Sequence, residues 1–374
     1  MPYGNNTFGL VDYCFFGATL AASAAIGLYF AIRNRRLKRT ELSKAKYSNT
    51  DDDRVGDSPD EVLLGGRKMP IVPTSLSLLT SFLSGITLLA MPAESYQRGI
   101  LFWISRMVGT AVALLISAFV VLPIFYHFRP TSAYEYFELR FGSLFLRRVA
   151  ATLYILFSAF YMAIVIYAPA VALSGVTRVS TWAFVVSVGI VCIAYSSFGG
   201  LKAVVWADTL QAGIMLIGII GLFFKGASDA GGLRKVLTMA WEDGRIDVAA
   251  NVDLNPLQYM TLWGAIFGGI GFWLSMLTFN QIALQRYLSM PTLSDARRVI
   301  AINIPSYIFM MTFADLLGLV MYAYYYGCDP LGARLVDTKD QLVIFFALDV
   351  FNEIPGLPGL FLACLFSGTL STVS

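Results

Sequence analysis

The chain has 374 residues, of which 57% are hydrophobic and only 14% are charged, and its formal net charge is +3. Soluble domains usually have about a quarter of their residues charged, so this composition excludes an ordinary soluble protein. The basic residues lie between long apolar runs rather than in one patch, which indicates a membrane protein and no nucleic-acid partner.

Nine apolar segments are long enough to cross a lipid bilayer, since a spanning helix needs about 20 mostly apolar residues. They cover residues 11–32, 72–95, 100–125, 149–173, 179–198, 202–224, 257–282, 300–326 and 358–374. Residues 1–10 are not a signal peptide, because no basic stretch precedes the first apolar run. We therefore expect an all-α polytopic membrane protein.

The distribution of basic residues predicts how the chain is oriented in the membrane. The segments 33–71, 126–148 and 283–299, together with Lys202, hold most of the 27 Lys and Arg residues. Because basic loops favour the cytosolic side, we expect residues 1–10 outside the cell and 33–71 as a cytosolic linker. Residues 225–256 then form an extracellular loop, and a glycosylation sequon begins at Asn5 on the same side.

Two of the spans contain residues that interrupt helices. The second span has Gly85 and Pro92, and the seventh has four glycines, Gly264, Gly268, Gly269 and Gly271. Glycine also permits close packing of membrane helices, which is the simpler explanation for either span alone. The two spans are five apart, so they correspond to each other if spans 2–6 and 7–11 are two five-helix repeats. Interrupted spans at matching positions predict the binding site of a secondary transporter.

Arg106 lies inside the third span, roughly 10 Å below the outer surface at a rise of about 1.5 Å per residue. A cation at this depth is costly and usually marks a transport pathway or a paired counter-ion. Its guanidinium would suit a carboxylate substrate. Two alternatives remain open: Arg106 extends to the outer interface, or it pairs with Glu94.

The ninth span carries five hydroxyl residues within eight positions: Ser367, Thr369, Ser371, Thr372 and Ser374. A dehydrated sodium ion needs about five or six oxygen ligands, and neutral hydroxyls and carbonyls bind it without preventing its release. Gly368 precedes Ser371 by one turn, so its carbonyl lies near both Ser371 and Thr372. The alternative is that these hydroxyls only bond to carbonyls four residues earlier.

The residues do not support a catalytic or transition-metal site. His127 is the only histidine, so neither a His-based triad nor a His metal site can form. The four cysteines have no metal or disulfide spacing, and GGIGF lacks the lysine of a phosphate loop. We therefore expect no enzymatic activity and no metal beyond sodium.

Seven segments carry a family resemblance: LLGGRKMP, PAESYQRG, TSAYEYFELRF, IVIYAPA, FGGLKAVVWADTLQ, NQIALQRYLS and FSGTLSTVS. In this order they resemble the sodium:solute symporter family, most closely the branch of the sodium/iodide, multivitamin and monocarboxylate cotransporters. The resemblance implies an inverted five-helix-repeat transporter fold with an extra N-terminal helix at 11–32. The first repeat would cover 72–224. Residues 257–374 would be a truncated second repeat with three of its five helices.

The same resemblance implies the residues of the binding sites. Sodium would be bound by Thr80, Leu83, Gly368, Ser371 and Thr372. Ser84 and Asp208 would support the sodium site, although a cap or salt bridge near the cytosolic boundary explains Asp208 equally well.

Three further residues are implied to contact the substrate: Thr87, Arg106 and Trp263. The family often has Gln at the position of Thr87, so the pocket differs here in a way that affects selectivity. Trp263 is alternatively a residue of the aromatic belt at the membrane interface.

The implied activity is sodium-coupled symport of a small anion across the plasma membrane by alternating access. The anion would be a monocarboxylate, a vitamin carboxylate or iodide, and sodium would be the co-transported ion. An alternative is a non-transporting sodium-binding sensor of the same fold. Because the second repeat is incomplete, we expect the chain to be a fragment or short isoform that does not support uptake by itself.

Overall fold

The computed structural model describes residues 9–47, 59–100, 102–174, 180–246, 255, 261–352 and 354–374. The sequon at Asn5 lies outside these residues. In order along the chain, the α-helices are α1 (Leu10–Tyr47), α2 (Pro59–Leu64), α3 (Ile71–Phe82), α4 (Gly85–Arg98), α5 (Phe102–Ile116), α6 (Leu122–Phe128), α7 (Glu135–Phe141), α8 (Leu144–Ser174), α9 (Thr181–Asp229), α10 (Leu233–Glu242), α11 (Leu262–Leu277), α12 (Gln281–Leu288), α13 (Leu293–Tyr324), α14 (Leu342–Phe351) and α15 (Leu357–Val373). The described residues form no strand, so the expected all-helical class is confirmed for them.

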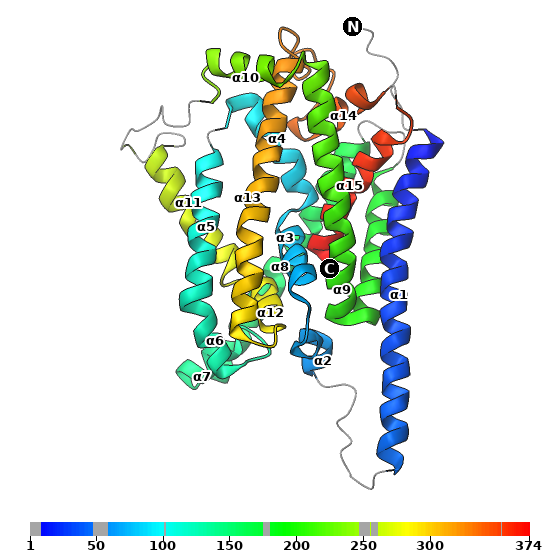
Figure 1. Ribbon diagram of the computed structural model, residues 1–374, viewed down its shortest axis with the longest axis vertical. Helices are drawn as coiled ribbons and strands as arrows, with labels where there is room; N and C mark the ends of the chain where they lie inside the picture. Colours follow the sequence, from blue (N-terminus) through cyan, green and yellow to red (C-terminus); the bar gives the residue numbers. More distant parts are fainter. Residues whose placement is uncertain are drawn as a thin grey trace.

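The long helices agree in position with the apolar segments. Within the described residues, five helices are long and apolar enough to cross a membrane: Leu10–Arg33, Phe102–Phe128, Leu144–Ser174, Gly199–Asp229 and Leu293–Tyr324. The pairs α3–α4 and α11–α12 each qualify as one broken span, and Thr181–Ser197 and Leu357–Val373 are shorter apolar helices. Most of these elements lie side by side along the long axis of the molecule (Figure 1).

The first helix is longer than its apolar segment. α1 continues to Tyr47, and α2 occupies Pro59–Leu64, so much of the expected linker 33–71 is helical. The reason is that residues 33–47 are rich in Arg, Lys, Leu, Glu and Ala, which favour helix without favouring the membrane. The expected extracellular loop 225–256 likewise contains the end of α9 and all of α10.

Spans five and six are continuous in α9 except at one residue. Gly200 has φ 61° and ψ −167°, a conformation that L side chains rarely adopt, and it separates the two helical halves. The structure therefore divides α9 where the sequence FGGLK separates the two expected spans.

Both expected interruptions occur, but the seventh span is not broken at its glycines. α3 and α4 meet at 61° around Leu83 and Ser84, and α11 and α12 meet at 58° after Leu277. All four glycines of the seventh span lie inside the continuous helix α11. A Cβ atom on Gly269 would lie 2.4 Å from the Ser105 hydroxyl oxygen, so this glycine allows α11 to pack closely on α5.

Candidate functional site

The break between α3 and α4 lies directly against α15. A Cβ atom on Gly368 would be 3.0 Å from the Leu83 carbonyl oxygen, and one on Gly85 would be 2.4 Å from the Thr369 hydroxyl oxygen. Small residues on both sides therefore let the two backbones approach. The Leu83 carbonyl and the hydroxyl-rich turn of α15 meet as a result.

The hydroxyls of this region form a buried hydrogen-bonded cluster. The Ser371 hydroxyl donates to Thr80 Oγ1 at 2.8 Å, and Thr80 donates to the carbonyls of Leu76 and Ser77 at 3.1 and 3.2 Å. Thr372 donates to the Gly368 carbonyl at 2.8 Å, as the alternative expectation for these hydroxyls requires. A hydroxyl that donates its proton still has lone pairs for a cation, so the two expectations are compatible.

The end of α3 adds backbone oxygens to the same cluster. The last carbonyls of a helix have no partner within the helix, and Thr80 lies in the last turn of α3, which ends at Phe82. All five residues expected to bind sodium are therefore adjacent: Thr80, Leu83, Gly368, Ser371 and Thr372. Their oxygens are neutral, which suits a hard monovalent cation.

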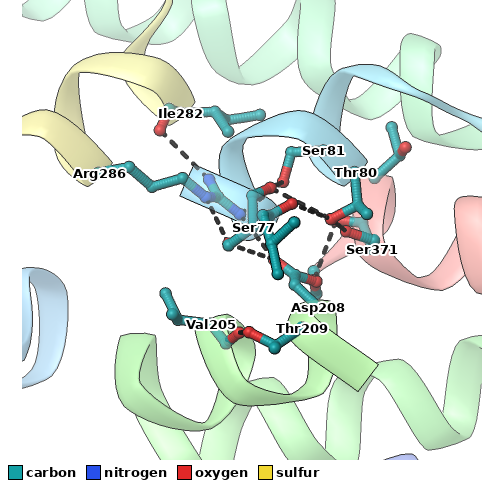
Figure 2. Close-up of polar contacts among 12 residues, drawn as sticks. Ser77, Thr80, Ser81, Val205, Asp208, Thr209, Ile282, Arg286 and Ser371 are labelled. Atoms are coloured by element: carbon teal, nitrogen blue, oxygen red, sulfur yellow. Dashed lines mark hydrogen bonds and ion pairs between the residues drawn. The ribbon is translucent and has the colours of Figure 1, made fainter. Parts of the chain in front are cut away.

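Asp208 of α9 is fully buried beside this cluster and forms a salt bridge (Figure 2). Its Oδ2 atom accepts a hydrogen bond from Ser77 at 2.5 Å and one from Arg286 at 3.1 Å. Arg286 also donates to Ser77 at 2.8 Å and to Ser81 at 2.6 Å. The salt bridge expected as an alternative for Asp208 is thus present, and it connects α9 and α12 to the turn of α3 that carries Thr80.

Sequence reasoning missed Arg286, Ser77 and Ser81. Arg286 was expected among the cytosolic basic residues, but only 4% of its surface is exposed. The sequence feature that could have identified Arg286 is its position as the only charged residue in NQIALQRYLS, one of the segments that carry the family resemblance. Buried beside Asp208, Arg286 neutralises the acidic charge next to the hydroxyl cluster.

A cavity of about 190 Å³ touches both the hydroxyl cluster and Arg286. Its walls include Ser81, Arg286, Ser371 and Thr372, and Leu63 of α2 lines it from the expected cytosolic side. The cavity therefore connects the cluster with the end of the molecule that the basic residues assign to the cytosol.

Ser84 and Thr87, which were expected at different sites, contact each other. Ser84 caps α4 by accepting the Thr87 backbone N–H at 3.2 Å, and the two hydroxyl oxygens are 3.0 Å apart. Thr87 therefore lies in the first turn of α4, directly after the break that faces the hydroxyl cluster.

Arg106 pairs with Asp315 of α13, not with Glu94. Its guanidinium donates to Asp315 Oδ1 and to the Met91 sulfur, and Ser95 donates to the same carboxylate oxygen at 2.9 Å. Arg106 is 5% exposed and Asp315 is fully buried, so the side chain does not extend to the outer interface. Glu94 instead pairs with Arg98 at 3.5 Å.

Trp263 lies apart from these residues. The residue is 43% exposed, and its ring stacks on that of Phe267 with centroids 6.4 Å apart, on a helix that packs mainly along α5. Among the described residues, its surroundings match the interfacial-belt alternative better than a place beside Thr87.

The family model of the sodium:solute symporter family matches residues 62–374. The chain belongs to this family. It is 40% identical over 373 residues to sodium-coupled monocarboxylate transporter 1 of Homo sapiens, covering 100% of this chain and 58% of that protein. It is 38% identical over 372 residues to the sodium-dependent multivitamin transporter of Oryctolagus cuniculus, covering 99% of this chain and 55% of that protein.

A solved structure supports the same fold. The chain is similar to a Na+-coupled sialic acid symporter in a substrate-bound outward-open state, with a TM-score of 0.83 and 22% identity. The match covers 98% of this chain and 71% of the symporter's chain. The family-model match and the two relatives confirm the expected family and its branch. The chain spans little more than half the length of these relatives.

Proposed function

We propose that the protein is a sodium-coupled symporter that imports a small anion across the plasma membrane. The observation that carries the proposal is the cluster of neutral oxygens between the α3–α4 break and α15. A sodium ion there would be bound by the carbonyls of Thr80, Leu83 and Gly368 and the hydroxyls of Ser371 and Thr372. The Gly368 carbonyl accepts the hydrogen bond from Thr372 and keeps a second lone pair for the cation.

Monocarboxylates are the first substrates to test, with vitamin carboxylates and iodide next. Two of the relatives above are named for monocarboxylates and vitamins. We place the anion beyond the sodium site, beside Thr87 and Ser84. Arg106 would reach a carboxylate only by exchanging Asp315 for it, and Trp263 would need to turn from its present exposed position.

The transport cycle follows from the two bent spans. In this proposal α3–α9 belong to the first inverted repeat and α11–α15 to the second, with the N-terminus outside the cell. Sodium would bind first and hold the broken span in its outward-open position, and the anion would follow. Rocking of one repeat against the other would release both toward the cavity beside Arg286. Each net positive charge that enters gains about 2.3 kcal/mol per 100 mV of membrane potential.

The test is uptake by the natural full-length product in cells with low background. Sodium buffer is compared with choline buffer for lactate, nicotinate, biotin, pantothenate and iodide. Sodium-dependent uptake of any one establishes symport and its substrate class. Protein at the surface with no uptake, but with sodium-dependent thermal stabilisation, would instead support the non-transporting sensor.

A further inference from the structure

α1 lies outside the two proposed repeats, contacts the first turn of α15, which carries the hydroxyl cluster, and packs along α9. In Figure 1 it lies at one edge of the molecule, beside α9 and α15. Its contacts with these helices include buried polar groups. Such groups are costly to bury inside a membrane unless they are hydrogen-bonded, and they commonly mark a functional region.

The first contact is at the outer end of α15. Asp12 is 6% exposed, and its Oδ1 atom accepts the backbone N–H of Gly359 at 2.9 Å. Gly359 is in the first turn of α15, and the helix's own N-cap residue, Gly356, has no side chain to accept such a bond. The carboxylate of α1 therefore caps α15 and also faces the positive end of its dipole.

The second contact is with Tyr195 of α9, which bonds to α15 next to the hydroxyl cluster. A Cβ atom on Gly27 would lie only 2.2 Å from Cβ of Tyr195 in α9, so α1 packs directly on this tyrosine. The Tyr195 hydroxyl donates to the Leu370 carbonyl at 3.1 Å. Leu370 immediately precedes Ser371, so Tyr195 fixes the backbone that presents Ser371 and Thr372.

The third contact lies next to Asp208. Gln211 of α9 donates from Nε2 to the Ser23 hydroxyl at 3.2 Å, and both side chains are fully buried. Gln211 follows Asp208 by three residues, so the two lie on neighbouring parts of α9. α1 is thus bonded to the helix that supplies the acidic partner of Arg286.

We propose that α1 is a positioning element of the sodium site. Asp12 holds the outer end of α15, and the fit of Gly27 against Tyr195 holds the carbonyl next to Ser371. Together these contacts set the axial position of the α15 hydroxyls against the break in span two. The inference rests on the proposed sodium site and adds to it a helix that contributes no ligand.

The physical basis is the small tolerance of a cation site for displacement of its ligands. A methyl group on Gly27 must move about 1 Å from Tyr195 to reach an ordinary contact of 3.4 Å. That displacement is large compared with the roughly 0.2 Å within which metal–ligand distances are normally held. A helix that merely covered the bundle would affect stability but not the affinity for sodium.

The experiment compares Gly27→Ala with Gly17→Ala in the natural full-length product. Both glycines lie in α1, but a Cβ atom on Gly17 meets nothing within 4 Å. Surface amount, maximal uptake and the sodium concentration for half-maximal uptake are measured for each. We expect Gly27→Ala to raise that sodium concentration roughly threefold to tenfold at equal surface amount, and Gly17→Ala to leave it unchanged.

A second variant keeps the test decisive if Gly27→Ala does not reach the surface. Tyr195→Phe removes only the hydroxyl that bonds Leu370 and should cause the same shift in sodium dependence without a loss of maximal uptake. Asp12→Asn keeps an oxygen for Gly359, so it should retain more sodium affinity than Asp12→Ala. An unchanged sodium dependence in Gly27→Ala or, failing that, in Tyr195→Phe would overturn the inference. Wild-type uptake that does not depend on sodium would instead overturn the proposed function.

Discussion

Replacing Arg106 by Met leaves the Asp315 carboxylate buried without its counter-ion. Removing one partner of a buried ion pair typically costs about 3–5 kcal/mol, whereas replacing both by apolar residues of similar size is often neutral or stabilising. Arg106 is 5% exposed and Asp315 is fully buried, and Ser95 offers the carboxylate its one other hydrogen bond among the described residues. We therefore expect Arg106→Met and Asp315→Leu each to destabilise by about 3–5 kcal/mol, and the double variant to regain most of that loss.

The assay is a denaturant titration of the purified natural product in detergent. Cys192 and Cys364 are buried and Cys14 and Cys328 are exposed, so a thiol-reactive dye reports unfolding once every exposed cysteine of that product is replaced by serine. The reasoning would be refuted if the double variant lost as much free energy of unfolding as the two single variants lose together. Uptake by a stable double variant then separates two roles of Arg106: retained carboxylate uptake makes it a counter-ion, and lost uptake at normal surface amount makes it a substrate contact.

Three further predictions concern the packing and the ligands of the proposed site. Ser371→Ala should raise the sodium concentration for half-maximal uptake roughly tenfold to a hundredfold, because a charge-assisted contact is worth about 1.5–3 kcal/mol; an unchanged sodium titration would remove Ser371 from the site. Gly368→Ala places a methyl group 3.0 Å from the Leu83 carbonyl oxygen and should also raise the sodium concentration for half-maximal uptake. Gly213→Ala, whose methyl group meets nothing within 4 Å, should leave that concentration unchanged. Gly269→Ala should lower the thermal unfolding midpoint by separating α11 from α5, while the neighbouring Gly268→Ala, in open space, should not; equal midpoints would contradict this account of their packing.

The sequence was sufficient for the order of the apolar helices and for the hydroxyl cluster. Hydropathy locates a span because burial in lipid requires about 20 apolar residues, but it does not locate the end of a helix. α1 therefore runs to Tyr47, through residues whose helix propensity is high and whose hydropathy is low. The break in the seventh span follows Leu277, not the glycines: Gly269 allows close packing against α5, whereas a Cβ atom on Gly268 or Gly271 meets nothing within 4 Å.

Charge pairs were the least predictable part of the site. Arg106 was correctly singled out as a deep cation, but its partner is 209 positions away in α13 and not at nearby Glu94. Asp208 and Arg286 are 78 positions apart and meet only because α9 and α12 both pack against α3. Such pairs depend on which helices become neighbours, which hydropathy along one chain does not record.

The salt bridge between Asp208 and Arg286 has a consequence for the energetic link between ion and substrate. The two opposite charges cancel, and the remaining oxygens of the cluster are neutral, so a bound cation keeps its full positive charge in the interior. An anion about 10 Å away would then be attracted by about 1.7 kcal/mol at an effective dielectric constant of 20. That energy corresponds to a roughly twentyfold gain in affinity, and linkage requires each solute to strengthen binding of the other equally. In the proposed symport, the electroneutrality of the cluster would thus supply cooperativity without any conformational change.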